Sequence, residues 1–344
     1  MTQRSAYAAA GVDIEAADAT KRGMKSIVRS TFGPGTLTDI GGFGGLFAPA
    51  WKDYREPVLV SSVDGVGTKL KVAFMTGVHH TVGIDLVHHC ANDILVQGAK
   101  PLFFLNYIGM GRHDPEVALA VVSGVAEGCR GVGCALVGGE TATMPDFYGP
   151  GEYDLAGTIV GIVERARIVD GSAIRPGDAL IGLGSDGLHT NGYALARRLL
   201  FEAAGMTPET RVEAWGATVG EELLKPHRPY VGPVFHLLDR TPVRGMAHIT
   251  GGGFVDNLPR ILPDGMKARI EQGTWPVSPV FTTLKAVGDV SEAEMYRVFN
   301  MGIGFVVAVP PDRAEETLAL LKAQGERAYR IGAVVEGDKD VEIV

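Results

Sequence analysis

The chain has 344 residues, of which 46% are hydrophobic, and it carries a formal net charge of −8. A chain of this length is expected to form about two domains with full cores, and its apolar content excludes an intrinsically disordered protein. The negative charge argues against a general nucleic-acid or membrane-surface binder, so local cationic or N–H groups have to meet any anionic ligand.

The cysteines and the N-terminal sequence indicate the cellular compartment in which the protein is expected. Cys90, Cys129 and Cys134 have apolar neighbours and lack metal-ligand spacing, which predicts buried free thiols. The N-terminus is polar and no uninterrupted apolar run reaches about 18 residues, so neither a signal peptide nor a membrane span is expected. These features favour a cytoplasmic protein.

The first expected helix, residues 14–31, carries a basic stripe. Lys21, Lys25 and Arg29 recur every four residues, a spacing that places them on one helical face. Such a stripe is usually just a solvated face. The following segment, residues 32–47, contains six glycines and little periodicity, which is typical of a mobile flap that closes over phosphates.

The hexapeptide Asp64–Lys69 follows an expected strand at Pro57–Ser62. It contains a carboxylate, two glycines, a hydroxyl and an ammonium. Glycines let peptide N–H groups approach an anion, a carboxylate and a hydroxyl suit Mg²⁺, and a lysine neutralises phosphate oxygens. The pattern predicts contact with a metal-bound polyphosphate, and a plain glycine turn between two strands is the alternative.

The expected helix Thr81–Gln97 has an apolar stripe flanked by polar side chains. Asp93 lies in its second half, directly before an apolar run, and a paired or metal-bound role explains a carboxylate at that place. A zinc site is an alternative, because four histidines lie in or near this helix, but no cysteine or spaced carboxylate completes a ligand set. These histidines are His79, His80, His88 and His89.

Strands and helices then alternate as far as Val169. The loop 137–141 follows a short strand and holds Gly139 and Glu140, which repeat the glycine–carboxylate pattern of the hexapeptide. Residues 167–177 are turn-rich and place a domain junction near Val169. The other elements expected in this half are a strand at Leu102–Ile108, a helix from Asp114 to Ala126, and strands at Cys134–Val137 and Asp154–Val163.

In the second half, residues 182–187 satisfy the pattern G-x-G-x-x-G after a short strand. A dinucleotide fingerprint is disfavoured, because the polar, turn-rich residues 207–216 stand where the next parallel strand is required. The same loop continues to His189 and Asn191, an imidazole and an amide at an expected helix start. These two residues are candidates for proton transfer or for contact with a charged substrate.

Two more glycine-rich loops follow. Three consecutive glycines in Thr250–Gly253 can free N–H groups for a phosphate, and Asn300 opens a similar loop before the strand Phe305–Val309. Close packing of the glycines is the alternative for both loops. A helix over 312–324 and a strand near 330–335 complete a second α/β unit. No complete P-loop motif occurs, so a Walker-type nucleotide site is not expected.

Taken together, these segments resemble the phosphoribosylformylglycinamidine cyclo-ligase family, also called aminoimidazole ribonucleotide synthetases. The matches occur in order from near residue 7 to the last strong strand. Chance does not account for so many ordered matches. The sequence departs mildly from the family pattern only at Ser185–Leu188 and Thr141–Thr143. The matching segments are Tyr7 with Gly11–Ile14, Asp64–Leu70, Gly83–Leu86 with Asn92–Asp93, Gly98–Leu105, Val137–Thr141, Tyr153–Gly157, His189–Tyr193, His248–Gly253, and Glu294–Tyr296 with Phe299–Gly302.

The resemblance implies a two-domain fold of the α+β or α/β class. Residues 1–168 are expected to form an ATP-binding and dimerisation domain, whose mixed sheet forms a barrel across a homodimer and which includes the mobile segment 32–47. Residues 169–344 are expected to form a C-terminal α/β domain. The nucleotide site is expected near the interface between the two subunits.

The resemblance also implies ATP-dependent closure of formylglycinamidine ribonucleotide to aminoimidazole ribonucleotide, with ADP and phosphate released, in purine biosynthesis. It implies ATP and Mg²⁺ as cofactors and neither nucleic acid nor membrane as partner. The residues it assigns are Asp64, Asp93 and Glu140 to Mg²⁺–ATP; Gly65, Gly67, Thr68, Lys69 and Gly139 to the nucleotide; Lys25, His189 and Asn191 to catalysis; and Thr250, Gly251, Gly252, Gly253 and Asn300 to the substrate.

Related activities of the same ATP-binding superfamily predict features that differ from those of this chain. A selenophosphate synthetase is expected to have a reactive cysteine or selenocysteine within residues 32–47, and none is present. A hydrogenase-maturation carrier needs a C-terminal cysteine, whereas this chain ends in Glu342-Ile343-Val344. A thiamine-phosphate kinase would yield a stable phosphorylated product. A nucleotide-sensing binding module would bind ATP without substrate-dependent release of ADP.

Overall fold

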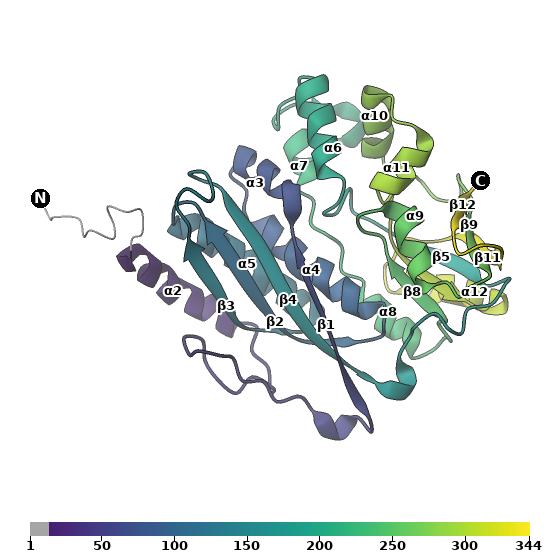
Figure 1. Ribbon diagram of the computed structural model, residues 1–344, viewed down its shortest axis with the longest axis horizontal. Helices are drawn as coiled ribbons and strands as arrows, with labels where there is room; N and C mark the ends of the chain where they lie inside the picture. The colour runs from purple at the N-terminus through teal and green to yellow at the C-terminus, as the bar shows by residue number, and fades with distance from the viewer. Residues whose placement is uncertain (1–13) are drawn as a thin grey trace, which may run out of the picture. The chain divides into compact units, whose positions relative to one another are not determined.

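The computed structural model describes residues 14–344, and the side chains of residues 14–17 are not described. Tyr7 and Gly11–Asp13 of the family match lie outside the described residues. The chain divides into two compact units (Figure 1). Unit 1 comprises residues 1–94 and 100–162, and unit 2 comprises residues 95–99 and 163–344.

Unit 1 is built on a four-stranded mixed sheet, as expected. Strand β2 pairs with β3 in parallel and with β4 antiparallel. Helix α5 connects β2 to β3, which is the crossover that a parallel pair requires. The strands, in their order across the sheet, are β1 (Pro57–Gly65), β4 (Tyr153–Glu164), β2 (Lys100–Met110) and β3 (Ala135–Thr143).

The helices α4 (His80–Leu95) and α5 (Pro115–Val132) lie behind the sheet in Figure 1. Helix α5 begins where the Asp114 carboxylate accepts the N–H groups of Glu116 and Val117, and it ends at Gly133 with φ 72°. The two helices approach closely at Gly83, where a Cβ would lie 2.2 Å from the carbonyl oxygen of Val121. This packing buries the apolar stripe that the sequence indicates.

The opposite face of this sheet, which we call the open face, is exposed. Along β2, Phe104 and Ile108 are fully buried while Leu105 and Tyr107 are exposed, which is the alternation expected of a strand with one covered face. On β1, Leu59 and Val63 are also exposed. The open face therefore presents apolar side chains from two strands.

Residues 32–47 fold back on themselves between α2 (Ile14–Arg29) and β1. Thr36 and Phe47 form an isolated antiparallel bridge, and the Phe47 ring lies 5.4 Å from that of Phe103 on β2. The segment ends before the short helix η1 (Trp51–Asp53), and η2 (Gly67–Lys69) with α3 (Leu70–Thr76) follow β1.

Unit 2 has a six-stranded sheet whose neighbours are antiparallel, apart from the parallel pair β12–β9. The expected α/β arrangement of this unit is therefore wrong, and the unit is α+β. Hydrophobic periodicity identifies strands without giving their direction, which explains the error. In order across the sheet, the strands are β12 (Val341–Ile343), β9 (Met266–Ile270), β11 (Ala328–Glu336), β5 (Ala179–Gly184), β10 (Ile303–Val309) and β8 (Gly245–His248).

Helices connect these strands. The expected helix after residue 193 is α6 (Tyr193–Arg197) followed by one π-helical segment, η4 (Arg198–Ala203). The polar stretch after it forms a short antiparallel pair, β6 (Arg211–Val212) with β7 (Ala217–Thr218), joined by one turn of 3-10 helix. The remaining helices are η3 (Arg165–Arg167), η5 (Glu213–Trp215), α7 (Val219–Leu223), α8 (Val231–Leu238), α9 (Gly253–Asn257), η6 (Leu258–Ile261), α10 (Pro279–Gly288), α11 (Glu292–Val298), η7 (Pro311–Arg313) and α12 (Ala314–Ala323).

Among the described residues, no helix is long and apolar enough to cross a membrane. The three cysteines are free and buried, as expected. Burial raises the pKa of the Cys90 and Cys129 thiols, which keeps both protonated at neutral pH.

Candidate active site

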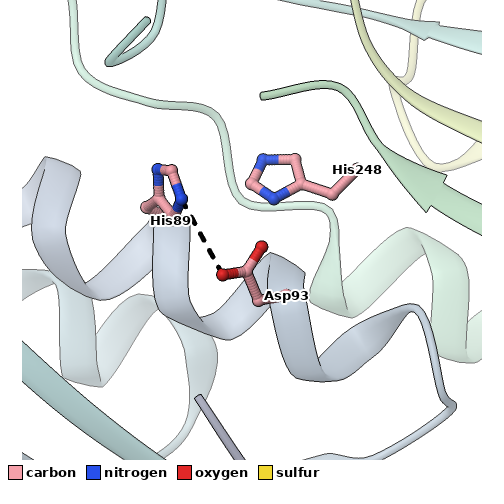
Figure 2. Close-up of side chains that lie close together, drawn as sticks. All are labelled: His89, Asp93 and His248. Atoms are coloured by element: carbon pink, nitrogen blue, oxygen red, sulfur yellow. Dashed lines mark ion pairs between the residues drawn. The ribbon is translucent and has the colours of Figure 1, made fainter. Parts of the chain in front are cut away.

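In unit 1, the structure brings Asp64 and Asp93 together around His89, which was considered before only as one of the four histidines of the zinc alternative. His89 Nε2 lies 2.9 Å from Asp64 Oδ2 and 3.8 Å from Asp93 Oδ2, and the hydroxyl of Ser62 donates to Asp93 Oδ2 at 3.1 Å. Asp64 is the penultimate residue of β1. His89 and Asp93 occupy successive turns of α4 (Figure 2). His248, also drawn in Figure 2, ends β8 (Gly245–His248) in unit 2.

The charges in this cluster support one another. Burial alone would lower the pKa of His89, but the hydrogen bond to Asp64 and the charge of Asp93 raise it. Burial alone would raise the pKa of Asp64, but His89 and the N–H of Gly65 lower it. Asp64 is therefore ionised at neutral pH, as a ligand for a cation has to be.

Glu140 is not brought to this cluster within one copy of the chain. It lies on β3, and β1 and β3 form opposite edges of the sheet, roughly three strand spacings or ~14 Å apart. Its register partner on β2 is Tyr107, a residue of the open face, whereas Asp64 turns toward α4. One ion cannot contact Asp64, Asp93 and Glu140 of the same copy.

Lys69 has a protein partner where a phosphate was expected. Its side chain is fully buried, and Nζ lies 2.9 Å from Asp85 Oδ1 and 2.8 Å from Oδ2 on α4. Burial lowers the pKa of Lys69, and the attraction of Asp85 counteracts that effect. The ammonium therefore compensates a buried carboxylate and anchors the hexapeptide on α4, while its contact with a phosphate stays a prediction.

The glycines of unit 1 have different roles. Gly67 has φ 69° and open space around it, so it supplies the left-handed turn before the exposed Thr68. At Gly139 a Cβ would lie 2.6 Å from the carbonyl oxygen of Asn106, so close packing requires a glycine there. At Gly65 the nearest atom, Leu155 O, is 3.2 Å away.

Lys25 connects helix α2 to the segment 32–47. Its Nζ lies 3.7 Å from Asp39 Oδ2, and Arg29 Nε donates to Asp39 Oδ1 at 2.9 Å. The hydrogen bond from Arg29 lowers the pKa of Asp39 to about 2. The basic stripe thus holds the glycine-rich segment against α2 through one carboxylate.

Three histidines of the zinc alternative have separate partners. His79 Nδ1 lies 3.1 Å from the hydroxyl of Tyr153, His80 Nε2 lies 2.8 Å from Glu127, and His89 pairs with Asp64. Three of the four histidines are therefore directed to different parts of unit 1, and the zinc alternative is not supported.

In unit 2, the predicted residues gather at one end of the six-stranded sheet. Strand β10 lies between β5 and β8, with Ile303 opposite Gly184 and Phe305 opposite His248. The register therefore places the loops after β5 and β8 beside the loop before β10. These loops carry all the unit 2 candidates, namely His189, Asn191, Thr250, Gly251, Gly252, Gly253 and Asn300. The antiparallel neighbours of β5 also remove the dinucleotide fingerprint, which requires parallel strands.

Asn191 approaches the glycine loop with a buried donor. Its Oδ1 lies 3.4 Å from the position that a Cβ at Gly251 would take. Its Nδ2 is buried and has no hydrogen-bond partner among the residues that the structure describes. An unpaired buried donor costs stability, and such groups occur where a ligand completes them. The geometry thus supports a ligand contact for Asn191.

Asn300 is engaged within the protein. Its Oδ1 accepts from the hydroxyl of Ser185 and the N–H of Gly302, both at 2.9 Å, and its Nδ2 donates to the carbonyl of Gly187 at 3.0 Å. The side chain is buried and ties two loops together. Asn300 therefore supports these loops, and its contact with the substrate stays a prediction.

Asn257 is a supporting residue that the sequence analysis missed. From α9 its Nδ2 donates to the carbonyls of Gly251 at 3.2 Å and Gly253 at 2.7 Å. The hydroxyl of Thr250 donates to Asn257 Oδ1 at 3.3 Å. An asparagine at the end of a five-residue helix is a weak signal in a sequence, because asparagine side chains bond nearby backbone groups in many proteins without such a role.

His189 is fully buried and has φ 60°, a strained backbone conformation for a residue with a side chain. Its Nε2 accepts the backbone N–H groups of Asp186 at 3.3 Å and Arg228 at 3.5 Å. A protonated Nε2 would face two donors, so this geometry favours the neutral tautomer with the proton on Nδ1. A Cβ at Gly304 would lie 2.5 Å from His189 Cε1, so the imidazole fits only against a glycine.

Comparisons with known proteins place the chain among named relatives. The family models described as "AIR synthase related protein, N-terminal domain" and "AIR synthase related protein, C-terminal domain" match residues 53–163 and 175–344. The phosphoribosylformylglycinamidine cyclo-ligase of Trichlorobacter lovleyi is 53% identical over 337 residues, which cover 98% of this chain and 97% of that protein.

Two solved structures share the fold at low sequence identity. Thiamine-monophosphate kinase from Stenotrophomonas maltophilia K279a aligns with a TM-score of 0.68 and 18% identity, covering 93% of this chain and 95% of that one. The hydrogenase maturation protein HypE in complex with ATP aligns with a TM-score of 0.63 and 20% identity, covering 92% of this chain and 88% of that one.

Proposed function

Because the chain belongs to the phosphoribosylformylglycinamidine cyclo-ligase family and is an enzyme, we propose that it closes formylglycinamidine ribonucleotide to aminoimidazole ribonucleotide with ATP. The observation that carries this proposal is identity of 53% along nearly the whole of both chains. The gathering of the unit 2 candidates at one end of one sheet supports it. The products are aminoimidazole ribonucleotide, ADP and phosphate, and the reaction belongs to purine biosynthesis.

The proposed chemistry proceeds through phosphorylation of the formyl oxygen. That oxygen attacks the γ-phosphorus and ADP leaves, giving an iminophosphate. The amidine nitrogen then attacks the former formyl carbon, the ring closes, and phosphate departs with the formyl oxygen while one proton is lost. Holding both groups in one bound molecule contributes much of the rate, because well-oriented intramolecular attack reaches effective molarities on the order of 10⁵ M or more.

The residues around His89 fit a Mg²⁺–ATP site. Asp64 and Asp93 offer carboxylate oxygens and Ser62 a hydroxyl, which are the hard ligands that Mg²⁺ prefers. Bound Mg²⁺ would neutralise charge on the phosphate oxygens. Asp64 and Asp93 would hold the ion, and the exposed Thr68 and the N–H groups of the turn at Gly67 would contact the phosphates. Lys25 and residues 32–47 would cover the nucleotide.

The substrate contacts proposed for unit 2 follow its loops. Asn191 would donate its buried Nδ2 to the substrate, and the N–H groups of Thr250–Gly253 would bind its phosphate. Asn257 and Asn300 hold these loops in place. His189, if it transfers a proton, would do so through Nδ1, because Nε2 already accepts two backbone N–H groups.

We also propose a homodimer that covers the open face of the unit 1 sheet. Exposure of apolar side chains on this face to water is unfavourable. These side chains are Leu59, Val63, Leu105 and Tyr107. Closing two such sheets on each other would form the expected barrel and protect the edge strands β1 and β3. A second copy would also offer Glu140 a nucleotide site that it cannot reach within its own copy. The buried thiols suit the reducing cytoplasm.

Incubation with formylglycinamidine ribonucleotide and Mg²⁺–ATP tests the proposal. The expected result is aminoimidazole ribonucleotide, with one ADP and one phosphate formed per product. Thiamine monophosphate serves as the control substrate, because a thiamine-phosphate kinase shares the fold. ATP binding without substrate-dependent formation of ADP would instead indicate a nucleotide-sensing module.

A further inference from the structure

Unit 2 contains a row of three buried imidazoles, and only His189 among them was an expected site residue. His189 lies in the loop after β5, His227 precedes α8, and His248 ends β8. Their exposed fractions are 0%, 0% and 5%. Three segments that are distant in the sequence therefore meet through histidine side chains, with His227 in the middle.

His227 contacts both of the other rings. Its ring stacks on that of His189, with centroids 4.0 Å apart and planes 24° apart. Its Nε2 lies 3.0 Å from His248 Nε2, and its Nδ1 lies 3.3 Å from the hydroxyl of Thr190. A hydrogen bond between two Nε2 atoms requires one of them to donate and the other to accept. The tautomers of His227 and His248 are therefore linked.

The row continues directly into the proposed substrate loops. His189 and Thr190 precede Asn191, and His248 precedes Thr250–Gly253. The Asn191 amide lies beside Gly251, so a shift of either loop would change the spacing of these two groups. The side chain of His227 is the described group that touches His189, Thr190 and His248 together.

We propose that His227 is a positioning residue that fixes the spacing of the Asn191 loop and the Thr250–Gly253 loop by stacking on His189 and sharing one proton with His248. This inference rests on the proposed function for its effect on the substrate. The link between the His227 and His248 tautomers is a property of the unliganded protein. This link can therefore be tested independently of the enzymatic activity.

Substitutions at His227 can separate its contacts. His227→Phe keeps a ring for His189 and removes both nitrogens, His227→Asn keeps a polar atom near Thr190, and His227→Gln keeps one near His248. The matched control is Thr317→Val, which removes a fully buried hydroxyl from α12 that donates to the Arg313 carbonyl at 2.8 Å. Thermal unfolding identifies variants whose fold is intact.

Kinetics of the full-length protein give the first measurement. His227→Phe is expected to raise KM for formylglycinamidine ribonucleotide by ~10-fold or more, the size expected for one lost buried hydrogen bond and its effect on an oriented loop. KM for ATP is expected to change by less than about twofold, as for an independent site. His227→Gln is expected to recover part of the loss. A substrate KM equal to that of Thr317→Val would overturn the proposal.

The second measurement is ¹H–¹⁵N NMR of the imidazole nitrogens without substrate. In the wild-type protein, His189 is expected in the Nδ1–H tautomer, and one of the pair His227 and His248 in the Nε2–H tautomer. In His227→Phe, the His248 signals are expected to move toward the average of both tautomers, whereas Thr317→Val leaves them unchanged. Unchanged His248 signals in a folded His227→Phe protein would refute the shared proton. A wild-type protein with linked tautomers but no cyclised product would refute the proposed function instead.

Discussion

Lys69 and Asp85 form an ion pair in the interior of unit 1, with Nζ 2.8 Å from Oδ2 and both side chains fully buried. The pair connects the hexapeptide after β1 to helix α4, the helix that also holds His89 and Asp93. A charge buried alone is strongly disfavoured, so each partner depends on the other. This dependence fixes the end of β1 against α4 and thereby sets where Asp64 lies.

Removal of one partner should therefore cost more than removal of both. Lys69→Met is expected to lower the free energy of unfolding by ~3–5 kcal/mol, because it leaves the Asp85 carboxylate buried without its cation. The double variant Lys69→Met/Asp85→Leu should recover most of that loss. Urea denaturation of the four proteins of the cycle measures the coupling, and additive losses would contradict a buried ion pair.

The proposed Mg²⁺ ligands make a separate prediction. Asp64→Asn and Asp93→Asn are each expected to raise the Mg²⁺ concentration for half-maximal turnover by at least ~10-fold, since changes even outside the ligand shell cost ~10–100-fold in metal affinity. Asp53→Asn, an exposed acid of η1, is the control. Turnover is measured by ADP release across a Mg²⁺ titration. An Asp64→Asn protein with the control's Mg²⁺ curve would remove Asp64 from the site.

Asn300 tests whether a buried amide supports a loop or contacts the substrate. Asn300→Ala removes three hydrogen bonds and is expected to lower the free energy of unfolding by ~1–3 kcal/mol in denaturant titrations. Asn300→Asp keeps the acceptor for Ser185 and Gly302 but loses the donor to Gly187. If both variants kept wild-type stability and lost only substrate affinity, Asn300 would be a substrate ligand after all.

Asp39 predicts a pH dependence for the anchor of residues 32–47. Its pKa is lowered to about 2 in the folded protein, below the ordinary value of 3.8, chiefly by the hydrogen bond from Arg29. The stability that this interaction contributes is therefore present above the unfolded pKa and is lost as the pH falls through about 2. Arg29→Gln is expected to raise the Asp39 midpoint toward 3.8 in an NMR titration of its carboxyl carbon. The same substitution at Arg22, an exposed residue of α2, should leave the midpoint unchanged.

The open face predicts an effect on assembly. Leu105→Glu places a charge in the centre of that face and is expected to convert the proposed dimer to a monomer in sedimentation velocity. Met75→Glu changes an exposed apolar residue of α3 and serves as the control. A Leu105→Glu protein that sediments like wild type would show that this face is not the interface.

Much of the local structure could be predicted from the sequence. Helical periodicity located α2, α4, α5 and α12, and the Asp114-Pro115 start of α5 was recognisable from its capping residues. The short strands β8, β9 and β12 were missed, because strands of three to five residues carry too few apolar positions to establish a period. The segment Leu95–Ala99 belongs to unit 2 although it lies within the first half of the chain, which local patterns do not reveal.

The sequence by itself determined the chemistry available to this protein: which loops carry carboxylates, amides and glycines, and the family whose ordered motifs they match. Only the tertiary structure decided which of these groups meet, because contacts between distant residues depend on strand direction and register. Antiparallel pairing of β10 with β5 and β8 gathered the loops of unit 2. Packing of the segment before α8 placed His227 between His189 and His248. Burial determined the partners of two predicted site residues. Lys69 pairs with Asp85 in the interior, and the buried Asn300 amide bonds the loops beside it.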